Sequence, residues 1–509
     1  MVGTGAALTG LASAQAPTPP VVTVIPPWQQ QPVTANPGNS ANSNNNYQAA
    51  MLPGNVANPT PGTFVVRFNG QLWSEFFLGG GSGFVGSGPT FVTSGGLGPG
   101  PGANGTAVFL GTGTNVGQKL APYSMGTYFR LYPGVDAMAT NGLRYGAQVE
   151  IRENFIAAQS NTGATGNSGL TSGQTLFVRR AFWYLAGENW GLLRAGQGDG
   201  VTGIMDNGIT TGQQPGQGLW NGDAPGIVAG NGPTYPWFSQ QGAEYGAPKI
   251  LYLSPQIYGF DFGFDWAANN GNQEFCGCVA QSGTPNLSST ITPPGGARAT
   301  NLYVGGARYQ GTFGPVALYA FGAYIGSGHV QYNSFALPAG TSGTLARTVE
   351  GGPTAAQGSQ YNGQFENLSA GFAGVAVTFG GFTVGGAWQG GQYNGVMATK
   401  PQNGVGAQAW VADIYYSNGP FSIGTTYYQF DSQGAIGLTG LSQRHEDAFG
   451  VGGAYAIAPG LLGYSELLYF SRHQAGFDFN NAKYFNQAGY AGNNDVHGTA
   501  FVVGARMRW

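Results

Sequence analysis

The alternation of apolar and polar residues constrains the fold more than any other feature of this sequence. In the stretch 143–152, Leu, Tyr, Ala, Val and Ile occupy one set of alternate positions, and Arg, Gly, Gln, Glu and Arg occupy the other. In the stretch 258–266 every second residue is aromatic and the residues between are Gly and Asp, and residues 501–509 alternate similarly. Because successive side chains of a β-strand point to opposite faces, these stretches predict strands with one face in an apolar medium and the other in a polar one.

Composition favours lipid rather than a second sheet as the apolar medium. Charged residues make up 8% of the chain, aromatic residues 13%, and 92 of the 509 residues are Gly. Ordinary soluble domains carry about 25% charged residues and about 7% Gly. A soluble β-sandwich would turn its polar faces to water, where we expect far more charge than the Gly, Gln, Ser and Arg found here. Aromatic rows facing lipid and a weakly charged lumen are typical of a transmembrane β-barrel, and the sandwich is the alternative.

Several function classes are excluded or disfavoured by the same composition. The net charge of −3 offers no basic patch for nucleic acid, and no run of about 18 apolar residues predicts a transmembrane helix. The pair Cys276 and Cys278 has no second cysteine pair or adjacent histidine, so we predict no disulfide framework, metal site or cofactor. The tripeptide His445-Glu446-Asp447 is interpreted as a solvated rim, and no nucleophile-elbow motif is present, so we expect no enzyme.

The connections between the predicted strands alternate short and long. From Thr63 onward we count sixteen candidate strands, one of which, 124–133, is expected to end at Pro133. Short periplasmic turns and long extracellular loops are typical of outer-membrane barrels, so the sequence predicts an all-β, 16-stranded antiparallel transmembrane β-barrel. The long connections fall near 79–123, 157–174, 198–247, 268–299, 326–364, 391–406, 431–445 and 473–496.

The N-terminal residues differ from the rest of the chain. Residues 1–16 are small and apolar and end in Ala14-Gln15-Ala16, which predicts the remnant of a signal peptide, with a flexible Ala/Gly tail as the alternative. Residues 17–61 are rich in Pro and Asn without periodicity, which predicts a disordered segment. The barrel is expected to occupy residues 62–509.

Five segments carry a resemblance to the trimeric general porins of Gram-negative bacteria. They are 66–70, 143–150, 179–185 followed by a tight turn and 191–197, 250–260, and the terminal Trp509. The resemblance implies a homotrimer in the outer membrane, surrounded by lipid and lipopolysaccharide. It also implies passive diffusion of small hydrophilic solutes and ions, and a third long loop folded inward as a constriction. The sequence departs from the family at Tyr184, at Gln197 and in 198–247, which lacks the usual acidic motif.

Charged residues at two places predict a constriction. The third long loop carries Asp199, Asp206 and Asp223. Strand parity predicts a lumenal basic wall, which would create a transverse field across the pore if the loop acids face it. The alternative is that these arginines are solvated or pair locally with Glu75 and Glu150, and Arg180 has the opposite parity, which predicts a rim or subunit interface. The predicted basic wall consists of Arg67, Arg130, Arg144, Arg152, Arg179 and Arg194.

Three functions stay open from the sequence. The first is a passive diffusion porin, and the second is a channel of the same architecture specific for a sugar or a carboxylate. Aromatic residues along one lumenal track, such as Trp73, Tyr128 and Tyr132, would favour a sugar channel. The third is a Gly-rich surface protein or adhesin without a pore, or a membrane-embedded enzyme.

Overall fold

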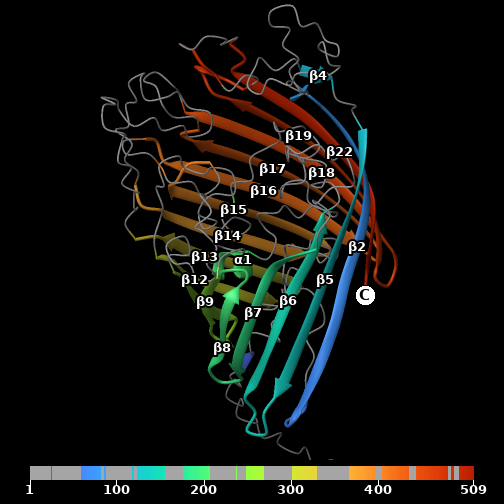
Figure 1. Ribbon diagram of the computed structural model, residues 1–509, viewed down its shortest axis with the longest axis vertical. Coiled ribbons are helices and arrows are strands. Elements are labelled where there is room, and N and C mark those ends of the chain that lie inside the picture. Colours follow the sequence, from blue (N-terminus) through green and yellow to red (C-terminus); the bar gives the residue numbers. More distant parts are fainter. Residues whose placement is uncertain are drawn as a thin grey trace, which may run out of the picture.

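A closed antiparallel β-barrel dominates the computed structural model (Figure 1). The structure describes residues 24–25, 59–81, 85–87, 117–119, 123–154, 176–206, 237, 248–268, 301–328, 366–395, 400, 404–434, 443–479, 483–485 and 492–509. Within these ranges no helix is long and apolar enough to cross a lipid bilayer.

The barrel is built from sixteen strands, each paired with its neighbours along the chain. The first and last strands also pair, from Gln71↔Arg508 to Gly81↔Gly498, which closes the barrel. The predicted fold class is therefore confirmed. The sixteen strands are β2 (Thr63–Gly81), β5 (Tyr123–Met138), β6 (Arg144–Asn154), β7 (Phe177–Gly187), β8 (Gly191–Gln197), β9 (Pro248–Leu253), β11 (Phe260–Ala267), β12 (Leu302–Phe313), β13 (Val316–Gly326), β14 (Ser369–Phe379), β15 (Phe382–Gln392), β16 (Ala407–Asn418), β17 (Phe421–Ser432), β18 (Arg444–Ala458), β19 (Leu461–His473) and β22 (Asp495–Arg508).

Smaller elements lie in the connections. One short helix, α1 (Val201–Met205), follows β8. Two short strand pairs stand apart from the barrel sheet, and a third pair extends it. These elements are β3 (Val85–Ser87) with β4 (Gly117–Lys119), β20 (Phe477–Asp478) with β21 (Lys483–Tyr484), and β1 (Val24–Ile25) with β10 (Gln256–Ile257).

Burial follows the predicted alternation. On β11 the side chains of Phe260, Phe262 and Phe264 are 60%, 56% and 51% exposed, whereas Asp261 and Asp265 are buried. The apolar side chains of the strands therefore lie on the outer surface of the barrel, and the polar ones line its inside. This is the arrangement of a membrane barrel, with lipid outside and a polar lumen.

The short turns lie at one end of the barrel. The pair Thr63↔Met138 places the start of β2 beside the end of β5, and the short connection 139–143 leads from there to β6. The tightest turns rely on glycine: Gly380 and Gly381 have φ of 56° and 85°, values that residues with a Cβ rarely adopt. The long connections join the strands at the opposite end.

The expected end of one strand at Pro133 is wrong, because β5 continues to Met138. Pairing with β2 runs through Phe68↔Pro133 without a break. Pairing with β6 skips from Leu131↔Ile151 to Gly134↔Gln148. Since proline lacks an N–H group, it interrupts the ladder on one side only and does not end the strand.

The N-terminal segment 17–61 is described at residues 24–25 and 59–61. Within the segment 17–61, for which we predicted disorder, Val24 and Ile25 form β1 and pair with Ile257 and Gln256 of β10. The division of the chain into residues 1–16, 17–61 and 62–509 stays a prediction. Asp223 and the pair Cys276 and Cys278 lie outside the described residues.

Candidate pore lining

Four of the predicted arginines point into the barrel. Arg67, Arg130, Arg144 and Arg194 are 6%, 5%, 1% and 2% exposed. Arg152 lies on the same face and is half-buried. Their positions agree with the strand parity deduced from the sequence, because each lies at an even spacing from other inward-facing residues of its strand. The side chain of the sixth residue, Arg179, lies outside the described part of the chain.

Arg180 corrects one expectation. Parity placed it at a rim or subunit interface, but its side chain is fully buried inside the barrel. The pairing between β6 and β7 shifts register there, since Glu150 pairs with Arg180 and Ile151 pairs with Val178. A bulge of this kind changes which side chain faces the lumen, and aromatic residues on both faces of β7 hide the parity in the sequence.

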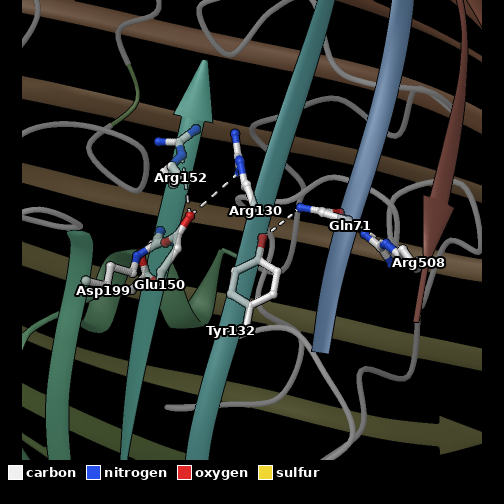
Figure 2. A network of polar contacts seen from close by, with 8 residues as sticks. Gln71, Arg130, Tyr132, Glu150, Arg152, Asp199 and Arg508 are labelled. Carbon is white, nitrogen blue, oxygen red and sulfur yellow. Dashed lines mark hydrogen bonds and ion pairs between the residues drawn. The ribbon is translucent and has the colours of Figure 1, made fainter. Parts of the chain in front are cut away.

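Glu150 is the centre of a polar network on the inner wall (Figure 2). Its Oε2 atom accepts a hydrogen bond of 2.5 Å from Nη1 of Arg180. Its Oε1 atom lies 3.5 Å from Nε of Arg152 and 3.9 Å from Nη1 of Arg130. One buried carboxylate therefore interacts with three guanidinium groups, one each from β5, β6 and β7. This finding agrees with the alternative that the arginines pair locally with Glu150.

Asp199 extends this network into the third loop. Its Oδ1 atom lies 2.5 Å from Nη2 of Arg180, and Arg194 donates a hydrogen bond to its backbone carbonyl. Nζ of Lys249 donates to the carbonyl of Gly198 over 3.0 Å. The first residues of the loop are thus attached to the basic wall. Asp199 contacts the arginines directly and does not face them across the lumen.

The loop then folds inward along the neighbouring strands. Oδ2 of Asp265 accepts a hydrogen bond of 2.6 Å from the backbone N–H of Val201, the first residue of α1. At the other end of the helix, Tyr319 donates to the carbonyl of Met205. Asp206 caps the helix and is buried. Residues 198–206 therefore form the inward turn that the resemblance implied.

Two glycines of the barrel wall make room for α1. A Cβ atom on Gly306 would lie 2.9 Å from Cγ1 of Val201, and one on Gly263 would lie 3.0 Å from Cγ2 of the same residue. Such distances are shorter than van der Waals contact, so any larger residue would displace the helix or itself.

The sequence reasoning missed other inward-facing ion pairs. Arg67 contacts Asp136 over 2.5 Å, and Tyr184 donates to the second carboxylate oxygen. Asp136 follows Pro133, where the strand was expected to end. Arg308 contacts Asp261 through two hydrogen bonds of 2.9 Å and 2.6 Å. Knowing the register of β11 and β12 would have been enough to predict this second ion pair, because Arg308 and Asp261 are direct cross-strand partners.

The two described aromatic residues of the suggested sugar track both face the lumen. Trp73 lies beneath the guanidinium of Arg130, 4.8 Å from it. The hydroxyl of Tyr132 accepts a hydrogen bond of 2.7 Å from Gln71. The side chain of Tyr128 is outside the described residues.

A family model for Gram-negative porins matches residues 111–475, most of the chain. The chain belongs to the Gram-negative porin family. It is an outer-membrane porin, and the barrel crosses the membrane with its strands. A search of curated proteins found no match.

Solved structures similar to this porin include other barrels. The anion-selective porin of Comamonas acidovorans is 14% identical, with a TM-score of 0.46 over 88% of this chain and 100% of that one. OmpT of Vibrio cholerae, in its trimer form, is 11% identical with a TM-score of 0.43 over 88% and 99%. OmpF of Salmonella typhi, in complex with daunomycin, is 12% identical with a TM-score of 0.47 over 87% and 97%.

Charge is distributed unevenly around the inner wall of the porin. Among the described inward-facing side chains, the consecutive strands from β22 through β2 to β9 carry an excess of basic residues. The strands from β11 to β19 carry an excess of acidic ones. The first group contains Arg67, Arg130, Arg144, Arg152, Arg180, Arg194, Lys249, Arg506 and Arg508 with Glu75, Asp136 and Glu150, and the second contains Asp261, Asp265, Asp413, Glu446 and Glu466 with Arg308, Arg444 and Arg472.

Proposed function

We propose that this porin forms a water-filled pore for passive diffusion of small hydrophilic solutes and ions. The observation that carries the proposal is the separation of charge between the two sides of the inner wall. Opposed walls of unlike charge orient water and polar solutes in the bore. A lipophilic solute must displace this oriented water, so its passage is disfavoured, while charged linings set the preference among ions.

In this proposal the described third-loop carboxylates, Asp199 and Asp206, do not face the basic wall across the pore. Asp199 is bound to Arg180 and Asp206 is buried at the end of α1. The opposing negative charge therefore comes mainly from β11 to β19. The loop contributes by position, since α1 is held against β11, β12 and β13 inside the barrel.

Planar-bilayer recording tests the proposal. We expect ohmic channels in the native protein, and a shift toward cations in the triple variant Arg130→Gln, Arg144→Gln, Arg152→Gln. One unit charge about 8 Å from an ion in water is worth about 0.5 kcal/mol, roughly twofold in permeability ratio, so three should shift the ratio severalfold. Gln408→Ala, on the outer face of β16, is the control. An unchanged reversal potential in the triple variant would contradict the proposal.

A substrate-specific channel has weaker support. The rings of Trp73 and Tyr132 are 1% and 2% exposed, and both have polar neighbours on the wall. An aromatic track that binds sugars needs exposed ring faces. Liposome swelling with a series of sugars and carboxylates separates the two functions, because a diffusion pore shows a smooth decline with solute size, and a specific channel saturates with one solute.

We further infer that the porin assembles as a homotrimer. Family membership supports this assembly, and so does the apolar outer face of β2, where Phe64, Val66 and Phe68 are 69%, 65% and 63% exposed. Native mass spectrometry of the detergent-solubilised protein should give three times the chain mass. A monomer under all mild detergents would contradict the inference.

A further inference from the structure

The last long connection of the barrel, between β19 and β22, folds back over the inner face of β18 and β19. Within it β20 and β21 pair antiparallel. We call the described part of this fold, residues 474–479 and 483–485, the inner hairpin. Phe477 is 5% exposed and Asp478 is fully buried, although connections of this kind normally run over the surface. The inner hairpin is therefore packed against the barrel and does not project into water.

Two arginines of the barrel bind the aromatic rings of the inner hairpin. Cζ of Arg444, the first residue of β18, lies 5.4 Å from the ring centroid of Phe477 and 5.2 Å from that of Phe479. Cζ of Arg472, on β19, lies 5.8 Å from the centroid of Phe479. The two rings meet edge to face, with centroids 5.2 Å apart. A guanidinium group within about 6 Å of a ring centroid is attracted by the ring quadrupole, so these contacts hold both rings in place.

Both arginines lie on the inner face of the barrel. Nε of Arg472 is 2.6 Å from Oε2 of Glu446, which is fully buried inside the barrel. Arg444 lies two residues before Glu446 on the same strand and therefore shares its face. Phe479 also packs against the buried apolar cluster of the barrel interior. The rings of the inner hairpin therefore point into the bore and not outward to lipid.

Hydrogen bonds at the base of the inner hairpin fix this inward course. The side chain of Gln474 is fully buried. Its Oε1 atom accepts a hydrogen bond of 3.0 Å from Nε of Arg444, and its Nε2 atom donates to the carbonyl of Gln433 over 3.0 Å. Nδ2 of Asn494 donates to the carbonyls of Gln474 and Phe477 over 3.1 Å and 3.0 Å. The base is thus bound to the inner wall and to the neighbouring connection between β17 and β18.

The inner hairpin and α1 enter the bore from different walls and at different heights. On one side β13 to β18 separate β12 from β19, so in a barrel of sixteen strands these two walls are nearly opposite. The helix contacts Gly306 within β12, whereas Arg444 and Arg472 lie at the long-loop ends of their strands. A solute that enters from the long-loop end therefore meets the inner hairpin before it meets α1.

We propose that the inner hairpin forms a second constriction, at the long-loop mouth of the pore, which limits the size of solutes entering from outside the cell. Long loops of outer-membrane barrels are extracellular, so this mouth is the entrance. Rings that are held by two guanidinium groups and a buried base narrow the bore permanently. The proposal rests on the proposed function as a diffusion pore and adds the residues that set its outer size limit.

Planar-bilayer recording with poly(ethylene glycol) of graded size tests the proposal. Channels are inserted in one orientation and polymer is added to one side at a time, because a polymer that enters the pore lowers its conductance. In native channels the smallest excluded polymer should be smaller on the long-loop side than on the turn side. This asymmetry tests the proposal without any variant.

The variant Phe477→Ala, Phe479→Ala removes both rings. Its conductance should rise, up to about twofold, since two narrow segments in series add their resistances. The exclusion limit on the long-loop side should shift to larger polymers, and the limit on the turn side, which α1 sets, should stay the same. Unchanged conductance with an unchanged long-loop limit overturns the proposal. An equal shift on both sides overturns it too, because the whole barrel would then have loosened.

Matched variants separate the constriction from other effects of the substitutions. Phe485→Ala removes the same ring from a position where it is 49% exposed, so it should behave like the native protein. Phe477→Tyr, Phe479→Tyr keeps both aromatic faces and should keep the native limits. Absence of channels in the native protein would overturn this proposal and the proposed function together. Native channels with the same exclusion limit on both sides would overturn the second constriction alone.

Discussion

Glu150 shows how one residue fixes the electrostatics of the basic wall. Arg180 is fully buried, and a buried charge is tolerated only beside an opposite one. The carboxylates of Glu150 and Asp199 each lie 2.5 Å from the Arg180 guanidinium. Glu150 thereby neutralises part of a wall that contains several more arginines than acids.

At this scale we predict that Glu150→Gln raises anion permeability. Removing one negative charge about 8 Å from the ion path changes the electrostatic energy of the permeating ion by about 0.5 kcal/mol. This change corresponds to roughly a twofold change in the permeability ratio. The reversal potential in a salt gradient measures this change. Glu188→Gln, which removes the same charge from the exposed turn after β7, should leave the potential unchanged. A shift toward cations would contradict the prediction.

The helix α1 depends on the wall behind it. Its first N–H group is bound by Asp265, its last carbonyl by Tyr319, and Gly306 supplies the space that its side chains fill. A five-residue helix has little stability of its own, so these tertiary contacts hold it in place. The position of α1 inside the barrel therefore depends on these contacts with the wall.

We predict that Gly306→Val displaces α1 and increases single-channel conductance. A Cβ atom there would lie 2.9 Å from Val201 and 3.1 Å from Sδ of Met205, and overpacking of this kind costs about 1–3 kcal/mol. Gly305→Val is the matched control on the same strand, since a Cβ atom at Gly305 meets nothing within 4 Å. Equal conductance of the two variants would show that α1 does not limit the pore.

Closure of the whole barrel joins residues from opposite ends of the sequence. Besides the ladder between β2 and β22, the N–H of Gly70 donates to the carbonyl of Trp509 over 3.1 Å, and the reverse bond measures 3.2 Å. The Trp509 ring lies against Gly70, where a Cβ atom would be 2.3 Å from Cζ2. Tyr464 donates to Glu75 across 389 positions of sequence.

We predict that Gly70→Val weakens this closure. The added side chain must displace the Trp509 ring, at a cost of about 1–3 kcal/mol. The variant should convert to the slow-migrating unfolded form at a lower temperature in heat-modifiability gels. Gly80→Val lies on the same strand and face in open space, so it should match the native protein. A native transition temperature for Gly70→Val would contradict the prediction.

The sequence by itself determined the strands, their number and the faces that meet lipid. These properties are local. Side-chain alternation, turn glycines and loop lengths can each be identified from one continuous stretch of the sequence. Phe260, Phe262 and Phe264 face outward as their spacing predicts. The arginines of β2, β5, β6 and β8 face inward for the same reason.

Only the tertiary structure decided which charges meet. The face of Arg180 depends on a bulge, the partner of Arg67 lies beyond a proline, and α1 rests on glycines of strands that follow it by many residues. The contact between His445 and Asp431 likewise needs the register of β17 and β18. Closure is non-local, because a pairing such as Gln71↔Arg508 joins residues far apart in the chain. Register is not fixed by alternation either, because the same alternation is compatible with several registers.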